Sequence, residues 1–301
     1  MKTLEGKVAV VAGASRGAGR GIACGLGEAG AIVYCTGRSV RGSTTDNRPE
    51  TIEETAEMVT ARGGVGISVQ VDHLEEGQVR ALFRRIKKEQ KKLDVLVNVI
   101  WGGMVYVTEY GKRFWNVDPN RGFLLLRQAV HAHILTTRWA LPLMIPRKQG
   151  LVIEIGDGDG LYYRGDVFVD LCKVSVMRLA WALSLELRKH GITSLALTPG
   201  YMRIELILEH LGVTEANWRD AIPKDPTFAE SETPFLVGRA VAALAADPNV
   251  AAKSGKTLAG WDLTKEYGLT DIDGRQPDIG PLVNKLFRDR YEKEGWLDFP
   301  A

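Results

Sequence analysis

The chain has 301 residues, of which 45% are hydrophobic and 25% charged, and these ordinary globular values exclude a disordered chain or a low-complexity repeat. Its 39 basic and 37 acidic residues leave a net charge of +2, too small for an evident nucleic-acid or membrane-surface binder, so neither partner is expected. No apolar run approaches the roughly 20 residues of a membrane span. Three widely spaced cysteines, Cys24, Cys35 and Cys172, argue against disulfides and metal sites and favour a reducing, cytoplasmic location.

Short β-branched runs alternate with amphipathic stretches along the chain. Strands are expected at 8–12, 31–36, 66–71, 93–98, 151–155, 193–198 and 257–259. Helices are expected at 20–29, 50–61, 75–90, 124–144, 167–189 and 234–246. Continuous apolar strands alternating with helices are typical of a parallel sheet that is covered by helices on both faces. The sequence therefore predicts an α/β fold. The basic run at 84–92 is interpreted as the solvated C-terminal end of a helix.

A glycine-rich turn follows the first predicted strand and leads into a helix. Residues 13–19 read Gly-Ala-Ser-Arg-Gly-Ala-Gly. Glycines at these positions allow a tight turn and let backbone N–H groups approach a pyrophosphate at the N-terminus of the helix. Taken alone, such a turn is only a strand–helix connection. With a strand before it and a helix after it, the turn predicts a dinucleotide-binding site.

The end of the second predicted strand indicates which dinucleotide to expect. An acid about 20 residues beyond the glycines would bind the ribose 2′-hydroxyl of NAD. Residues 36–39 instead read Thr-Gly-Arg-Ser, with Arg41 nearby and Arg16 inside the glycine-rich turn. Guanidinium groups bind phosphate in bidentate fashion, and no carboxylate stands there to repel it. NADP(H) is therefore preferred to NAD(H); the alternative is that Arg38 and Arg41 are ordinary loop arginines.

Further motifs follow at regular places in the pattern. Asp72 ends the third predicted strand, Asn98 ends the fourth, Lys173 lies on the long helix 167–189, and Pro199-Gly200 follow the sixth strand. In order and spacing, these motifs and the glycine-rich turn resemble the short-chain dehydrogenase/reductase family over roughly residues 5–260. The resemblance implies a Rossmann-type, doubly wound parallel sheet that forms a single domain over residues 1–301. It also implies binding of NAD(P)(H) and transfer of a hydride to or from a carbonyl or an alcohol.

The resemblance also implies a role for each matching residue. The phosphates would be held by Gly13, Ser15, Arg16, Gly17 and Gly19. Asp72 would contact the adenine, Asn98 the ribose side and Lys173 the nicotinamide ribose, and Pro199 and Gly200 would lie beside the nicotinamide. The C-terminal extension, about 262–301, continues beyond the usual end of the family, and its role is open. The long helix 167–189 is more apolar than one sheet face requires, so a homodimer or homotetramer is expected.

The reaction centre departs from the family pattern. The family's chemistry uses a phenol four residues before the lysine, where it shares a helix face with the ammonium that lowers its pKa. Counting back from Lys173, that position is Val169, which transfers no proton. After strand 151–155, where a serine should orient the substrate, stand Gly156 and Asp157. Of the proton-transfer groups only Lys173 clearly remains.

Other polar positions of the family are replaced as well. The helix asparagine that holds a relay water falls near Ala129, and Ile204 stands where a hydroxyl residue would bind the carboxamide. Val99-Ile100-Trp101 replace the small residues expected after the fourth strand. Aliphatic side chains at Val99, Val169 and Ile204 predict an unusually dry surface beside the nicotinamide.

Several groups are candidates for the missing acid. Asp157 either orients or protonates the substrate, if burial raises its pKa, or is a loop acid that favours the turn. Tyr162, Tyr163 and Tyr201 are alternative phenols, although places in the pocket wall are preferred for them. Lys173 is preferred as a ribose ligand over a surface lysine, because it lies in line with an apolar side of its helix.

Three functions remain open on this basis. The preferred one is an NADP(H)-dependent oxidoreductase acting on a carbonyl, an alcohol or an activated alkene, either weakly or with another acid such as Asp157. The others are a redox-silent NADP(H)-binding protein and a lyase or isomerase that keeps the cofactor for structure. The stretch 200–233 is predicted to be a substrate lid, because loops beyond strand C-termini cover ligands in this architecture. Its apolar residues favour a small, mainly apolar substrate.

Overall fold

The computed structural model describes residues 2–107 and 111–286, without the side chain of Met104. Parallel strands form one sheet in the order β3-β2-β1-β4-β5-β6-β7. The strands are β1 (Val8–Ala12), β2 (Ile32–Gly37), β3 (Val65–Gln70), β4 (Val95–Asn98), β5 (Gly150–Ile155), β6 (Ile192–Thr198) and β7 (Thr257–Ala259). The order reverses between β1 and β4, so the loops after these two strands diverge and leave a crevice at the carboxyl edge of the sheet.

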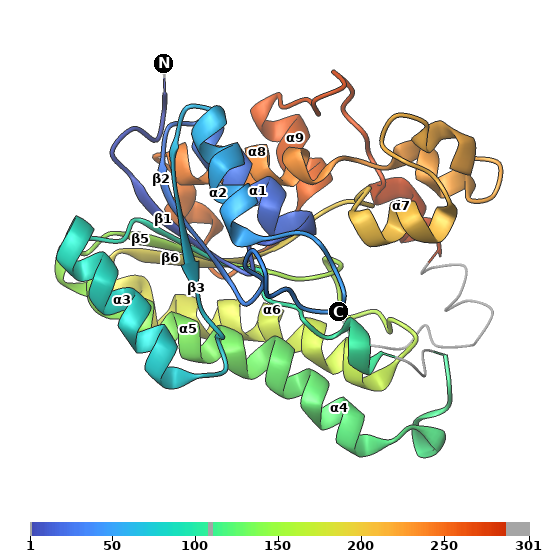
Figure 1. The fold of residues 1–301 in the computed structure, drawn as a ribbon, viewed down its shortest axis with the longest axis horizontal. Helices are drawn as coiled ribbons and strands as arrows, with labels where there is room; N and C mark the ends of the chain where they lie inside the picture. Colours follow the sequence, from blue (N-terminus) through green and yellow to red (C-terminus); the bar gives the residue numbers. More distant parts are fainter. Residues whose placement is uncertain (1, 108–110, 287–301) are drawn as a thin grey trace.

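Helices cover both faces of the sheet (Figure 1). One layer contains α1 (Gly17–Glu28), α2 (Ile52–Ala61), α8 (Pro234–Ala246) and α9 (Gly260–Tyr267). The other contains α3 (Glu76–Gln90), α4 (Pro119–Leu126), α5 (Ala132–Ala140) and α6 (Val167–Leu187). The short α7 (Glu205–Leu211) lies to one side of both layers. The predicted doubly wound Rossmann-type fold is confirmed. None of the helices in the described ranges has the length and apolarity that crossing a bilayer requires.

The two layers are built from alternate residues of the same strands. In β1, Ala9 and Val11 belong to the core beneath α1, α2 and α8, whereas Val8 and Val10 belong to the core beneath α3 and α5. Successive side chains of a strand point to opposite faces, so a strand that is buried on both faces must be apolar throughout. This explains the continuous apolar runs in the sequence.

The largest difference from the predicted elements lies at 124–144, which the sequence indicates as one helix. The chain there forms α4, a π-helical turn (Arg127–His131), α5 and two short 3₁₀ turns. The 3₁₀ turns contain Pro142 and Pro146. The α-helix ends before them because a proline lacks the N–H that would continue it. The π-helical turn directs residues toward the crevice, as such turns often do at functional sites.

Close backbone contact fixes α1 against α8. A Cβ atom added to Gly21 would lie 1.9 Å from the carbonyl oxygen of Pro234, and one added to Gly25 would lie 2.3 Å from the backbone of Gly238. The two helices therefore touch along glycine positions, and this contact places the start of α1 beneath the crevice.

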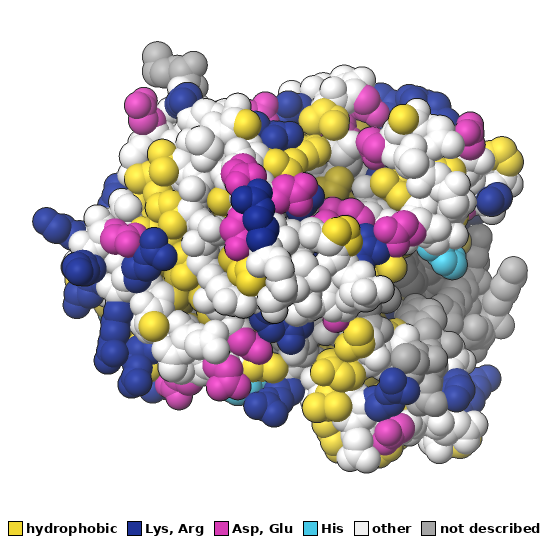
Figure 2. Space-filling view, viewed as in Figure 1, with side chains coloured by type: hydrophobic (Ala, Val, Ile, Leu, Met, Phe, Trp, Pro, Cys, Tyr) yellow, Lys and Arg dark blue, Asp and Glu magenta, His cyan; other side chains and the backbone are white. Residues whose placement is uncertain are grey.

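The basic run at 84–92 is exposed, as predicted. Arg84, Lys87 and Lys88 project from the last turns of α3, and Arg85 forms an ion pair with Glu89 at 2.7 Å. Dark blue side chains gather along this edge of the molecule at the lower left of Figure 2.

Candidate active site

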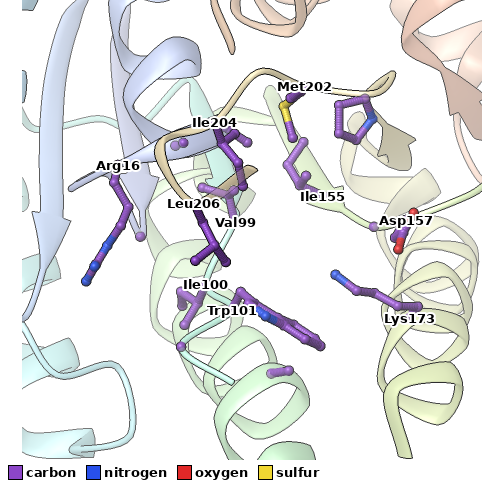
Figure 3. A pocket seen from close by; sticks show the side chains of 18 of the residues that line it. Arg16, Val99, Ile100, Trp101, Ile155, Asp157, Lys173, Met202, Ile204 and Leu206 are labelled. Atoms are coloured by element: carbon purple, nitrogen blue, oxygen red, sulfur yellow. The ribbon is translucent and has the colours of Figure 1, made fainter. Parts of the chain in front are cut away.

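A cavity of about 1140 Å³ opens at the carboxyl edge of the sheet. Residues that follow each of the strands β1 to β6 line it. Most of the residues that the sequence assigns to the site are among them: Gly13, Ser15, Arg16, Gly17, Gly19, Arg38, Asp72, Asp157, Lys173, Pro199 and Gly200. Asn98 and Val169 do not line the cavity. In Figure 3, Arg16 lies at one end and Lys173 with Asp157 at the other, with aliphatic side chains between them.

The glycine-rich turn forms one end of the cavity. Gly13 and Gly17 have φ angles of +97° and +52°, in the left-handed region that favours glycine. A Cβ atom added to Gly19 would lie 2.0 Å from the carbonyl oxygen of Gly13, so no other residue fits there. Helix α1 begins at Gly17, so the first N–H groups of the helix lie at the cavity, and that of Gly17 donates to the Glu205 carboxylate at 3.1 Å. This cradle of backbone donors fits the pyrophosphate of a dinucleotide.

Arginines line the cavity where β2 ends. Arg16 donates a hydrogen bond to the Thr45 hydroxyl at 2.8 Å and lies 3.5 Å from Asp46. Arg38 forms no ion pair with any other residue in the described parts of the chain. Arg41 turns away from the cavity and pairs with Glu57 on α2 at 2.6 Å. Arg16 also lies 3.8 Å from Glu50, so two carboxylates already pair with it. The alternative of an ordinary loop arginine therefore describes Arg41, while Arg38 remains available to an anion.

The strand β3 delivers Asp72 to the cavity, and His73 follows it. His73 lies between the hydroxyls of Thr36 and Thr136, each at 2.8 Å from a ring nitrogen. Burial lowers the pKa of His73 to about 3, so the ring is neutral at physiological pH. Asp72 accepts a hydrogen bond from the backbone N–H of Leu74 at 2.9 Å, which fixes its carboxylate at the end of the strand.

Asn98 takes part in a buried network of side chains, and its expected contact with the ribose stays a prediction. Its side chain is fully buried between β4 and β5, where its amide nitrogen donates to Glu154 at 2.9 Å and to Thr137 at 2.8 Å. Glu154 also lies 2.6 Å from His133, whose other ring nitrogen donates to the carbonyl oxygen of Ile100 at 2.9 Å. This network holds the chain after β4 in place. Because it uses the Asn98 amide inside the sheet, no Asn98 donor reaches the cavity.

Val169 is likewise not part of the cavity wall. It belongs to a buried cluster with Leu125, Ala129, Phe168 and Cys172, and Trp101 packs against this cluster. The ammonium nitrogen of Lys173 lies 3.9 Å from the centre of the Trp101 ring. Trp101 therefore provides apolar surface near Lys173, and the place of Val169 beside the nicotinamide stays a prediction. The lining by Val99 and Ile204 is as expected.

Lys173 and Asp157 lie at the same end of the cavity, and the Lys173 nitrogen points toward Trp101 (Figure 3). Burial lowers the pKa of Lys173 below its usual value, and the negative charge of Asp157 opposes that shift. Arg164 holds the backbone next to Asp157: its Nε donates to the Asp157 carbonyl oxygen at 2.6 Å, and its guanidinium pairs with Asp170 on α6 at 2.8 Å. The loop after β5 is thus tied to the helix that carries Lys173.

The candidate phenols are poorly prepared for proton transfer. Tyr162 and Tyr201 line the cavity, and Tyr163 does not. Burial and the neighbouring Asp159 raise the pKa of Tyr162. Burial and a hydrogen bond to Asp225 raise the pKa of Tyr201 to about 12. These shifts oppose the lowering that a catalytic phenol requires, and the preference for both residues as pocket wall stays a prediction.

The two ends of the predicted lid, 200–233, are joined by hydrogen bonds. The backbone N–H of Arg203 donates to the carbonyl oxygen of Glu232 at 2.7 Å, and the Glu232 carboxylate accepts from the N–H of Gly200 at 3.1 Å. Its cavity-lining residues include Tyr201, Met202, Ile204, Glu205, Leu206, Ile207 and Thr227. Movement of this segment as a lid stays a prediction.

Sequence reasoning missed several residues of the wall. Trp261 on α9 and, beyond it, Ile279, Val283 and Leu286 close the substrate side of the cavity. This gives part of the C-terminal extension a place in the site, whereas residues 287–301 lie outside the described residues. Gln128, in the π-helical turn, also lines the cavity. No periodic pattern marks these residues, because their roles depend on tertiary contacts.

The fold and the site together define a class of protein. The sheet is doubly wound, and the glycine cradle lies where the strand order reverses, with a lysine at the other end of the same cavity. These features are those of a Rossmann-type dinucleotide-binding protein.

Comparisons with known proteins identify the family. The family described as short chain dehydrogenase matches residues 7–209. Dehydrogenase/reductase SDR family member 1 of mouse is 36% identical over 275 residues, 90% of this chain and 85% of that protein, and the human protein is also 36% identical. Oxidoreductase UcpA of Escherichia coli K12 is 28% identical over 82% of this chain and 90% of its own.

Solved structures agree on the fold. A short chain dehydrogenase from Mycobacterium thermoresistibile has a TM-score of 0.73 at 22% identity and covers 89% of each chain. The chain belongs to the short-chain dehydrogenase/reductase family, a family of oxidoreductases that bind a nicotinamide dinucleotide.

Proposed function

We propose that this protein is an NADP(H)-dependent oxidoreductase that acts on a carbonyl, an alcohol or an activated alkene. The observation that carries the choice of NADP(H) is Arg38, which lines the cavity directly after β2 without an ion-pair partner among the described residues. Arg16 lines the same end. The Arg38 guanidinium, at the place where NAD-binding proteins have an acid, favours a 2′-phosphate, whereas Arg16 is shared with Asp46 and Glu50.

The bound dinucleotide would supply or accept the hydride, and the protein would position it. The glycine cradle and the start of α1 would hold the pyrophosphate, Asp72 would bound the adenine end, and Lys173 would contact the nicotinamide ribose; all of them line the cavity. Positioning alone supports much of the rate of hydride transfer, since the reaction depends on the alignment of two carbon centres.

Proton transfer is assigned to Lys173 with Asp157. The Lys173 ammonium, with its pKa lowered by burial, donates a proton to the substrate oxygen, and Asp157 attracts the ammonium electrostatically. Trp101 stabilises the charged form of Lys173 by a cation–π contact. The Lys173 ammonium is expected to transfer a proton less well than the usual tyrosine, so slow turnover is expected for unactivated ketones.

The substrate is proposed to be mainly apolar. The far part of the cavity is lined by Trp101, Met202, Leu206, Trp261 and Ile279. Burial of an apolar molecule against these side chains contributes about 25 cal/mol for each square ångström removed from water.

The test is NADPH consumption with a panel of aldehydes, ketones and activated alkenes, compared with a Lys173→Met variant. Consumption by the wild type, and its loss in the variant, is the expected result. Binding of NADPH without consumption of it in any reaction would favour the redox-silent alternative. That alternative has its own support in the burial of Val169 and in the raised pKa values of Tyr162 and Tyr201.

A homodimer or homotetramer is part of the proposal. Helix α4 packs beside α6, and both carry exposed apolar side chains: Phe123, Leu124, Leu171, Trp181 and Leu185. Yellow side chains gather over α4 at the lower right of Figure 2. Large exposed apolar patches on soluble proteins commonly mark interfaces.

A further inference from the structure

Two carboxylates of α7 contact groups that the cofactor's phosphates need. Glu205 is the first residue of α7, and Glu209 follows it by four positions, so both lie on one helix face. This face is turned toward the glycine cradle and the loop after β2. Neither residue carries a role in the cofactor site described above.

Glu205 occupies the N-terminus of α1. Its carboxylate accepts a hydrogen bond from the backbone N–H of Gly17, at 3.1 Å to one oxygen and 3.4 Å to the other. Ile204 lies beside it, 3.4 Å from the position of a Cβ added to Gly17. The start of α7 therefore rests directly on the start of α1, where the helix dipole and the unpaired N–H groups favour a negative charge.

Glu209 contacts a second cation of the cavity. It forms an ion pair with Arg48, whose guanidinium also pairs with Glu50 at 2.8 Å. Arg48 lines the cavity on the same side as Arg16 and Arg38. One terminal nitrogen of Arg48 thus pairs with Glu209 of the 200–233 segment, and the other pairs with Glu50.

We propose that Glu205 and Glu209 set the affinity for the dinucleotide by competing with its phosphates. Glu205 competes with the pyrophosphate for the N-terminus of α1, and Glu209 competes with the 2′-phosphate for Arg48. A carboxylate that already accepts from the Gly17 N–H weakens what this donor offers a phosphate, and two anions at the same helix terminus repel each other. The inference rests on the proposed function, because it requires a dinucleotide with a 2′-phosphate in this cavity.

The competition couples cofactor binding to the substrate wall. Leu206 and Ile207, next to Glu205 on α7, line the cavity. When a pyrophosphate displaces the Glu205 carboxylate, the attachment of α7 to α1 weakens and these apolar side chains are released to adjust. If the dinucleotide changes the affinity for an apolar ligand bound against α7, that ligand must change the affinity for the dinucleotide by the same factor.

The experiment measures dissociation constants of NADPH and NADH by titration calorimetry for Glu205→Gln, Glu209→Gln and Asp220→Asn. Glutamine keeps an oxygen that accepts from Gly17 while removing the charge. Asp220 is an exposed acid elsewhere in the 200–233 segment, and its variant controls for net charge. Circular dichroism confirms that each variant is folded.

The two glutamates give different expected results. Glu205→Gln binds NADPH and NADH more tightly by the same factor, about tenfold, because both dinucleotides carry the pyrophosphate. Glu209→Gln tightens NADPH binding about fivefold and leaves NADH binding unchanged, because only NADPH carries the 2′-phosphate. Asp220→Asn changes neither constant.

Two results overturn the inference and are distinguishable. If the wild type binds NADPH and neither glutamine variant binds it more tightly, the competition is absent while the proposed function stands. If neither the wild type nor any variant binds either dinucleotide, the proposed function fails and this inference fails with it.

Discussion

Val169 stands where the family has a tyrosine, and the aromatic ring beside Lys173 is that of Trp101 instead. In the structure the ammonium rests on the Trp101 ring, 3.9 Å from its centre, and burial lowers its pKa. The ring stabilises the cation while the dry surroundings favour the neutral amine. Lys173 therefore keeps a pKa below its usual value, even without a tyrosine next to it.

Restoring the phenol should raise activity only when space is made for it. Val169 is packed in a buried cluster against which Trp101 lies, so Val169→Tyr alone introduces a ring without room. We expect the double variant Val169→Tyr with Trp101→Ala to reduce carbonyl compounds at least about tenfold faster than the wild type, since a positioned acid contributes roughly 10²–10⁴-fold. Initial rates of NADPH oxidation measure this.

The single variant Trp101→Ala is the matched control for that double variant. A folded double variant no faster than this control would show that the helix face of Lys173 does not present residue 169 to the substrate.

Two buried groups give stability opposite pH dependences. Burial lowers the pKa of His73 to about 3 and raises the pKa of Glu232 to about 8. Unfolded His73 binds a proton below its usual pKa of 6.5, so its contribution to stability is lost as pH falls from there toward 3. Folded Glu232 keeps a proton that the unfolded chain releases above 4.5, so its contribution is lost as pH rises toward 8.

Glu232→Gln should therefore flatten the decline in the free energy of unfolding between about pH 6.5 and pH 8, by at most roughly 1.4 kcal/mol for each pH unit. Urea denaturation at several pH values measures the slope, and Glu5→Gln, at an exposed position, is the control. Equal slopes for the wild type and Glu232→Gln would mean that Glu232 ionises normally in the fold.

At the scale of single residues, the sequence predicts identities better than orientations. It indicates that a valine replaces the phenol, but whether Val169 faces the cavity depends on Trp101, a residue far away in the chain. Asn98 is a similar case, because its amide is taken by Glu154 on the neighbouring strand. The sequence did contain a signal for that network: Glu154 is an acid within an otherwise apolar strand, and such a buried charge requires partners.

Among the elements, α1 and α8 show how glycine positions set the placement of the cofactor cradle. Glycines inside a helix cost stability relative to alanine, about 1 kcal/mol each. Along α1 this cost is offset because Gly21 and Gly25 let α8 come into backbone contact. The start of α1, which follows the glycine-rich turn, is thereby fixed against α8.

A pair of glycine-to-alanine variants separates this contact from helix propensity. Gly21→Ala places a methyl group 1.9 Å from the Pro234 carbonyl oxygen, so we expect a loss of about 3 kcal/mol or more in the free energy of unfolding. Gly77→Ala, in α3, meets nothing within 4 Å and should gain roughly 0.5–1 kcal/mol. Chemical denaturation measures both. Similar effects of the two variants would contradict the proposed role of the close contact.

Prediction of elements succeeds where the pattern is local. Strand β1 and helix α8 begin and end at the predicted residues, since continuous apolar runs and a proline at the first helical turn mark them. The helix predicted over 124–144 is interrupted by a π-helical turn that its apolar periodicity does not reveal. The place of α7 on α1 is not predictable either, because Glu205 and Gly17 are 188 positions apart.

For the whole molecule, the exposed apolar side chains of α4 and α6 predict association. We expect the wild type to elute as a dimer or tetramer, and the double variant Trp181→Lys with Leu185→Lys to shift toward the monomer, because buried unpaired charges oppose an apolar interface. Light scattering during gel filtration measures the mass. The variant Arg84→Glu with Lys88→Glu, on α3, serves as a control that leaves this face unchanged. A monomeric wild type would contradict the expectation.

The whole cavity joins segments from both halves of the chain: the glycine cradle, the lysine helix, the 200–233 segment and residues up to Leu286. The sequence predicts the first two, because they are motifs with fixed spacing. The wall formed by Trp261, Ile279 and Val283 has no such spacing and follows from the packing of the chain beyond β7.

The central claim is that this cavity binds a dinucleotide through its 2′-phosphate. The most direct measurement is the dissociation constant of NADPH and of NADH, by calorimetric titration of the wild type and of Arg38→Ala. NADPH is expected to bind the wild type at least about tenfold more tightly than NADH, and the alanine variant to lose most of that preference. Equal binding of NADPH and NADH by the wild type, or binding of neither, would contradict the account.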